Sequence, residues 1–135
     1  MDRATIEFNF SKAKEQASKL ETTAGRIRTI SNSNVKSAMQ DVSIAWKGEN
    51  SQKYVSKGDV IAGKIVTVAN GVTAVASTIR AVAKNIYDAE MEALRIEEER
   101  AYRARLAEEA RKKAEEEAAK SSSKNGKHTG GGGHF

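Results

Sequence analysis

The sequence of 135 residues contains no cysteine and no proline, and its two histidines lie in the last eight residues. Without cysteine there is no disulfide scaffold, no cysteine nucleophile and no cysteine-ligated metal or iron–sulfur centre. The scarcity of histidine leaves little for a zinc site or for histidine-based catalysis. Neither a phosphate-binding glycine loop after a strand nor an H-E-x-x-H pattern occurs. We therefore expect a protein that is not an enzyme and holds no metal or cofactor.

A strong excess of charge of one sign is also lacking. Lys and Arg number 23 against 18 Asp and Glu, which gives a net charge of +5. Residues 1–84 carry 13 basic against 7 acidic side chains, and residues 85–120 carry 8 against 11. Nucleic-acid binders usually present a denser basic face with aromatic residues between the charges. We therefore expect no nucleic-acid partner.

Long hydrophobic runs are missing as well. The first ten residues lack the basic start and apolar run of a secretory signal. The most apolar stretch, residues 60–83, is interrupted by Lys64, Asn70 and Arg80 and has helical periodicity. The sequence therefore predicts neither a cleaved signal peptide nor stable insertion into a membrane.

What is present is a hydrophobic repeat between residues 54 and 96 that alternates steps of four and three residues. This spacing is typical of the seam between packed helices, and the period of two expected of a strand is absent. Alanines beside the repeat widen it, which indicates burial against more than one neighbour. We interpret eight residues as a core or interface seam: Ile61, Ile65, Val68, Val72, Val75, Ile79, Val82 and Ile86.

A second periodic segment precedes this one and covers roughly residues 11–45. The step from Ile27 to Val35 is eight residues, one more than a heptad, and residues 31–34 (SNSN) are poor helix formers. This irregularity predicts a bend, a local distortion or a shift of the seam. A break into two helices is the alternative.

The two segments meet at residues 46–51, where Gly48 follows the last periodic residue, Trp46. Glycine adopts the left-handed conformation that ends a helix, and so short a connection allows only an antiparallel neighbour. The sequence therefore predicts an all-α fold with an antiparallel two-helix hairpin over residues 1–90. One hairpin buries a single face of each helix, so we expect dimerisation toward a four-helix bundle.

Beyond the predicted hairpin, residues 91–120 pair glutamates with basic residues at four-residue spacing, which supports an exposed, charged extension of the second helix. Residues 121–135 are rich in glycine and serine and are expected to form a disordered tail.

The sequence also allows predictions for individual residues at the turn and in the second helix. A tryptophan at a helix end is usually a packing anchor, so we expect Trp46 to be buried, with an additional role in recognition as the other interpretation. Tyr87 is expected to cover the open end of the hairpin beside Phe8 or Phe10. Gly58, Gly63 and Gly71 interrupt the second helix, and indicate either close helix approach or tolerated flexibility.

The tripeptide Trp46-Lys47-Gly48, at the turn of a hairpin with heptads on both sides, resembles the WXG100 family, the ESAT-6-like proteins of type VII secretion. The resemblance covers about residues 5–90. It implies a homodimer or heterodimer that leaves a Gram-positive cell without a cleaved signal peptide, after a cytoplasmic pool has formed. The implied partners are the chain itself, another WXG100-like protein or the helical N-terminal domain of an LXG-type toxin, together with the secretion ATPase.

The chain departs from this family in its export signal, which is commonly Y-x-x-x-[DE] after the second helix. The residue four positions after Tyr87 is Met91, so the candidate export-signal region is the imperfect match formed by Tyr87, Asp88 and Glu90. The resemblance therefore implies either a secreted substrate or a targeting partner, or chaperone, of a larger effector. The alternative is an intracellular coiled-coil scaffold or adaptor in which W-x-G occurs by chance.

Overall fold

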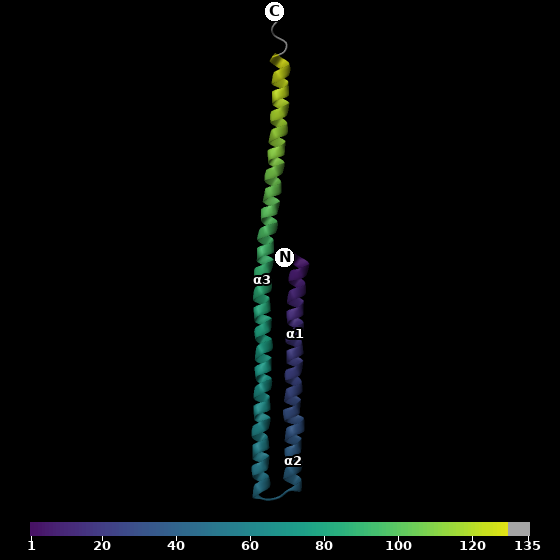
Figure 1. The fold of residues 1–135 in the computed structure, drawn as a ribbon, viewed down its shortest axis with the longest axis vertical. Coiled ribbons are helices and arrows are strands. Elements are labelled where there is room, and N and C mark those ends of the chain that lie inside the picture. Colours follow the sequence, from purple (N-terminus) through teal and green to yellow (C-terminus); the bar gives the residue numbers. More distant parts are fainter. Residues whose placement is uncertain (130–135) are drawn as a thin grey trace, which may run out of the picture. The chain divides into compact units, whose positions relative to one another are not determined.

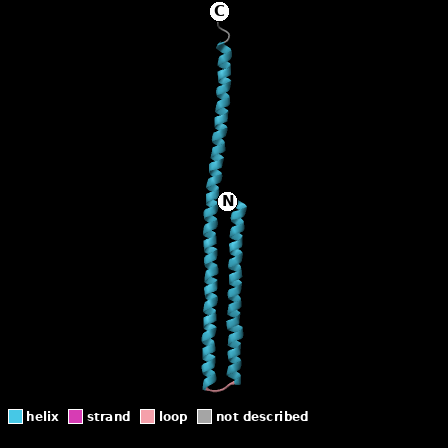
Figure 2. Cartoon of the chain, viewed as in Figure 1, coloured by secondary structure: helices cyan, strands magenta, loops and turns pink. Residues whose placement is uncertain are grey.

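The computed structural model describes the backbone of residues 1–129 and the side chains of residues 1–123. The elements are α1 (Arg3–Thr29), the π-helical η1 (Ile30–Val35), α2 (Lys36–Ala45) and α3 (Glu49–Thr129) (Figure 1). The described residues contain no strand, and the one loop between helices is the turn before α3 (Figure 2). The all-α class predicted from the hydrophobic spacing is confirmed.

The first helix begins at Arg3, eight residues earlier than the periodicity suggested. Asp2 is its N-cap, and the Oδ1 atom of Asp2 accepts a hydrogen bond of 2.8 Å from the backbone N–H of Thr5. An aspartate in this position satisfies one of the free N–H groups of the first turn and stabilises the helix start.

The irregularity at residues 30–35 is a π-helical turn and not a break. The backbone N–H of Lys36 donates to the carbonyl oxygen of Ser31, five residues earlier. A π-helical turn accommodates one residue more than an α-helical turn. The extra residue accounts for the eight-residue step from Ile27 to Val35. Of the alternatives left open by the sequence, the local distortion is confirmed.

The chain divides into two compact units, Met1–Met91 and Glu92–Phe135. In the first unit, α1, η1 and α2 lie beside the part of α3 that precedes residue 92 (Figure 1). Residue numbers rise along one segment as they fall along the other, so the two segments are antiparallel. The contacts that show this are Phe10 with Tyr87, Ser18 with Arg80, Arg28 with Asn70, and Ser31 with Ala62.

Apart from Ile6, which is 1% exposed, the core of the first unit is built from small side chains at seven-residue spacing. Ala17 and Ala24 of α1, and Ala62, Ala69 and Ala76 of α3, are all 0% exposed. Alanine at the contact allows two helix backbones to approach closely, whereas branched side chains hold them farther apart. The alanines that lie beside the predicted seam therefore form the centre of the contact between α1 and α3.

The predicted seam itself lies to one side of this core. Ile65, Val72 and Ile79 are half-buried, whereas the other five residues are between 49% and 58% exposed. The interpretation as a core within a single chain is therefore wrong for five of the eight residues: Ile61, Val68, Val75, Val82 and Ile86. Its role as an interface with another chain stays a prediction.

The second unit is described from Glu92 to Thr129 and consists of the continuing helix α3. Ion pairs between residues three or four apart run along it, including those of Arg95 with Glu92 and Glu99. The tail expected to be disordered from residue 121 is helical as far as Thr129, because a helix that is already formed propagates at low cost. The rest of that tail, residues 130–135, lies outside the described residues.

One helix, α3, is long and apolar enough to cross a membrane by length and composition alone. Its most apolar window of 18 residues has a mean hydropathy of 1.5, and 17% of that window is buried. The expectation that this helix is too polar for a span is therefore wrong on composition, since residues 65–79 carry no charge. A helix that packs against other helices passes the same test, so this finding is weak evidence for a membrane.

Candidate interaction surface

The turn between α2 and α3 is fixed by Gly48, whose φ is 126°. Its carbonyl oxygen accepts a hydrogen bond of 2.8 Å from the Oγ of Ser51, which lies in the first turn of α3. L-amino acids with a side chain rarely adopt this φ, whereas glycine does so without steric cost. The glycine of the W-x-G tripeptide is therefore required by the backbone of the turn.

Trp46 lies at the end of α2 with extended backbone, and its indole ring tilts against the ring of Tyr54 with 6.3 Å between centroids. The two residues are 49% and 52% exposed. The expectation that Trp46 is buried is therefore wrong for the single chain, and Tyr54, the ring that it contacts, is at the surface too. About half of the residue remains open to solvent, which favours a role in recognition.

Four large side chains of α3 repeat at seven residues on one exposed edge of the first unit. We call this set the apolar stripe: Ile61, Val68, Val75 and Val82, which are 54%, 58%, 52% and 49% exposed. At 1.5 Å per residue the apolar stripe is about 32 Å long. Isolated exposed apolar residues are common on proteins, but a contiguous stripe with helical spacing is typical of an interaction surface.

The opposite edge of the first unit is closed by hydrogen bonds between α1 and α3. We call it the polar edge. The guanidinium of Arg80 donates to Glu21 Oε1 at 2.7 Å and to Ser18 Oγ at 2.9 Å, and this contact lowers the pKa of the Glu21 carboxyl. Arg28 donates to Asn70 Oδ1 and to Thr73 Oγ1, each at 3.0 Å. The first unit therefore presents one satisfied polar edge and one open apolar edge.

The glycines within α3 differ in what surrounds them. A Cβ added to Gly58 would collide with the Met39 side chain of α2, so the two helices approach closely at that position. Cβ atoms added at Gly63 and Gly71 would meet no atom within 4 Å. Close approach, one of the two expectations, is therefore confirmed for Gly58 and not observed within this chain for the other two.

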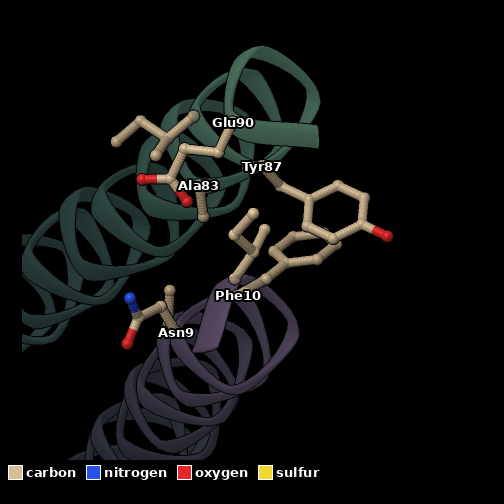
Figure 3. A pocket seen from close by; sticks show the side chains of 8 residues that line it. Asn9, Phe10, Ala83, Tyr87 and Glu90 are labelled. Atoms are coloured by element: carbon tan, nitrogen blue, oxygen red, sulfur yellow. The ribbon is translucent and has the colours of Figure 1, made fainter. Parts of the chain in front are cut away.

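The candidate export-signal region lies at the far end of the first unit. Tyr87 is half-buried and stacks on Phe10 with 4.5 Å between ring centroids, as expected for a residue that covers this end. The ring pair borders a shallow hollow of about 160 Å³, with Asn9 and Glu90 on its other side (Figure 3). Asp88 forms an ion pair of 2.9 Å with Lys84. Tyr87 is thus held by packing and Asp88 by an ion pair, whereas Glu90 borders the hollow.

No group of three or more His, Asp or Glu side chains converges on a metal position in the described part of the chain. The sequence did not predict the polar edge, and it placed the buried alanines of α3 beside the seam and not at the centre of the contact. Alanines spaced by seven residues in both segments were a signal for the core, whereas nothing in the spacing of Glu21 and Arg80, 59 residues apart, pointed to their pairing. Comparisons with family models, with curated proteins and with solved structures found no match to this chain.

Proposed function

We propose that this chain is a small non-enzymatic protein of a type VII secretion system that acts by helix–helix association. In this proposal residues 1–91 form a helical hairpin that dimerises toward a four-helix bundle, with itself or with a WXG100-like or LXG-type partner. The protein is then a secreted substrate or the targeting partner of a larger effector, with a cytoplasmic pool before export and no cleaved signal peptide.

The apolar stripe is the observation that carries the proposal. A single pair of helices leaves about half of each of these four side chains in water, and each fully buried Val or Ile side chain contributes about 1.5–3 kcal/mol. Covering the stripe with further helices recovers the remainder of that free energy. The turn supports the same function, because Gly48 is needed by the backbone and Trp46 stays half-exposed for recognition.

The proposal is tested by secretion from a Gram-positive host that carries a type VII apparatus. We expect the protein in the culture supernatant of intact cells, and its loss from the supernatant when the secretion ATPase is deleted. Trp46→Ala should lower the secreted fraction without lowering the cytoplasmic pool. Tyr54→Phe is the matched control, since it keeps the aromatic contact with Trp46.

Two results would contradict this function. One is a supernatant without the protein while the cytoplasm contains it, and the other is a secreted pool that does not depend on the ATPase. A cytoplasmic marker protein measured in the same supernatant excludes lysis as the source.

An intracellular coiled-coil scaffold or adaptor is the second candidate, and the candidate export-signal region favours it. The Tyr87 ring is stacked on Phe10 and the Asp88 carboxylate is paired with Lys84, so a secretion receptor that bound these two side chains would have to compete with both contacts. This function needs the apolar stripe alone and treats the W-x-G turn as structural. A protein found only inside intact cells, in complex with another helical protein, would support it.

A further inference from the structure

We propose that residues 92–123 are a self-supporting single α-helix, a semi-rigid spacer that keeps its own two ends about 47 Å apart without a partner helix, at about 1.5 Å per residue. The inference does not rest on the proposed function, because it concerns the second unit alone. It is carried by the exposure of this segment, by its ion pairs and by the order of its charges.

The segment has no buried face within the second unit. Every residue from Arg100 to Ser123 is exposed, including the two largest apolar side chains, Tyr102 and Leu106, which are 53% and 46% exposed. A helix that is polar all round bridges domains through solvent, is stabilised by many pairs three or four residues apart, or is unstable. The helical state of this segment therefore depends on interactions between its own turns.

Ion pairs join successive turns of the segment. The guanidinium of Arg95 donates to Glu92 Oε1 at 2.7 Å and to Glu99 Oε2 at 3.0 Å. Arg103 donates to the other carboxylate oxygen of Glu99 at 2.8 Å, so one connected network covers about three helical turns. A second network joins Arg111 to the glutamates three residues before it and four residues after it. These networks connect the turns that packing leaves unsupported.

The order of the charges extends this pattern to the whole segment. Between residues 92 and 123 no two charges of the same sign stand four positions apart, whereas opposite charges do so repeatedly. Opposite charges at this spacing stabilise a helix, and like charges destabilise it. All of residues 92–120 except Ile96 and Tyr102 are also strong helix formers, namely Ala, Leu, Glu, Lys or Arg. The sequence is therefore suited to a helix that forms without tertiary contacts.

The same order leaves no apolar seam for a second helix. A coiled coil needs apolar residues at heptad spacing over at least about three heptads. Between residues 100 and 120, every line of residues at seven-residue spacing contains a charge; Arg111, for example, interrupts the line from Ala104 to Ala118. The apolar stripe of the first unit has no such interruption. The two units therefore differ, because the first exposes a seam and the second does not.

The test measures a distance within the full chain, which has no cysteine of its own. Spin labels are attached to the double variant Ala93→Cys and Ala119→Cys, at two exposed positions. A continuous helix places these positions about 39 Å apart, whereas a flexible chain of this length has a root-mean-square separation of about 28 Å and a broad distribution. We expect double electron–electron resonance to give a narrow distribution near the helical value. It should not change over about a tenfold range of protein concentration.

Two charge exchanges separate the order of the charges from their number. The variant Glu109→Arg with Arg111→Glu puts like charges four residues apart at 105 and 109, at 109 and 113, and at 111 and 115. The matched control, Glu97→Arg with Arg100→Glu, creates no such pair, because the positions four residues from each site are uncharged. Both variants keep the composition and the net charge. We expect a broader distance distribution and a weaker helical circular dichroism signal for the first exchange only.

Three results would overturn the inference. They are a broad distribution near about 28 Å in the unmodified chain, a narrow distribution that appears only as the protein concentration rises, and equal broadening by the two exchanges. The second result would show that the segment is ordered by binding another copy, and Tyr102→Ala with Leu106→Ala should then abolish that ordering. All three would leave the apolar stripe and the proposed function standing, whereas a failed secretion assay would contradict that function alone.

Discussion

Gly48 and Gly63 are both at the surface, yet replacing them with alanine should have opposite effects on stability. Gly48 has φ at 126°, where a residue with a side chain is strained by about 1–3 kcal/mol. Gly63 is inside α3 with open space beside it, where alanine stabilises a helix by about 0.5–1 kcal/mol. We expect Gly48→Ala to lower the free energy of unfolding and Gly63→Ala to raise it, measured by urea denaturation of both variants. A gain for both would show that the turn has a different φ in solution.

Trp46 carries a second prediction at this scale. Replacing a buried tryptophan by alanine costs about 3–5 kcal/mol, but Trp46 is 49% exposed. We therefore expect Trp46→Ala to lower the free energy of unfolding of the isolated chain by only about 1–2 kcal/mol. Denaturation at low protein concentration is the measurement. A loss above about 3 kcal/mol would mean that another chain covers the indole.

At the scale of elements, the alanine core makes the packing of α1 on α3 sensitive to side-chain size. Ala69 is fully buried between the helices, and enlarging a packed site costs about 1–3 kcal/mol. We expect Ala69→Leu to destabilise the first unit by that amount. Ala74→Leu, at an exposed position of the same helix, should change stability by less than about 0.5 kcal/mol. Thermal unfolding followed by circular dichroism compares the two, and equal effects would argue against the close helix contact.

The polar edge predicts a dependence of stability on pH. The hydrogen bond from Arg80 lowers the pKa of the Glu21 carboxyl in the folded chain, so this contact stabilises the fold above the ordinary glutamate pKa of about 4.3. The contribution is lost as the pH falls through the lowered pKa. We expect Glu21→Gln to flatten the fall of the urea midpoint between about pH 5 and pH 3. Glu7→Gln serves as the control for removing one exposed carboxylate, and equal slopes for both variants would contradict the role of the pair.

Much of the helical arrangement could be predicted from the sequence, because spacing and turn chemistry are local. The extra residue between Ile27 and Val35 is visible as a step of eight, and a π-helical turn is one of the few ways to absorb it. The faces that α1 and α3 turn toward each other could not be predicted in the same way. Large Val and Ile side chains normally outweigh alanine in burial, yet here alanines such as Ala62 occupy the contact. Alanine occupies the contact because the two helix backbones approach closely, and that approach depends on both helices together.

The surface could be predicted only in part for a related physical reason. The apolar stripe is visible in the sequence as a heptad, but its exposure follows from α1 packing beside it and not on it. The polar edge combines residues of two helices far apart in the sequence, such as Glu21 and Arg80, and no pattern within one helix relates them. Properties shared between elements therefore needed the structure.

At the scale of the whole molecule, the two units differ in what stabilises them. Met1–Met91 has a core with fully buried side chains, whereas residues 101–123 of the second unit are exposed throughout. The second unit relies on ion pairs such as those of Arg111 with Glu108 and Glu115, and solvent-exposed pairs of this kind stabilise a helix only weakly. Local opening of a helix without buried contacts costs far less free energy than opening a packed core. The two units should therefore open independently.

Hydrogen exchange of the full chain measures this difference directly. We expect slow exchange of the backbone amides near Ala24 and Ala69, and fast exchange throughout residues 101–123, because no packed core protects the latter. Raising the salt to about 1 M should speed exchange in the second unit and leave the first nearly unchanged, since the ion pairs are screened and the alanine core is not. Slow exchange across residues 101–123 at low protein concentration would contradict this division. Slow exchange that appears only as the protein concentration rises would instead show that this segment associates with another copy.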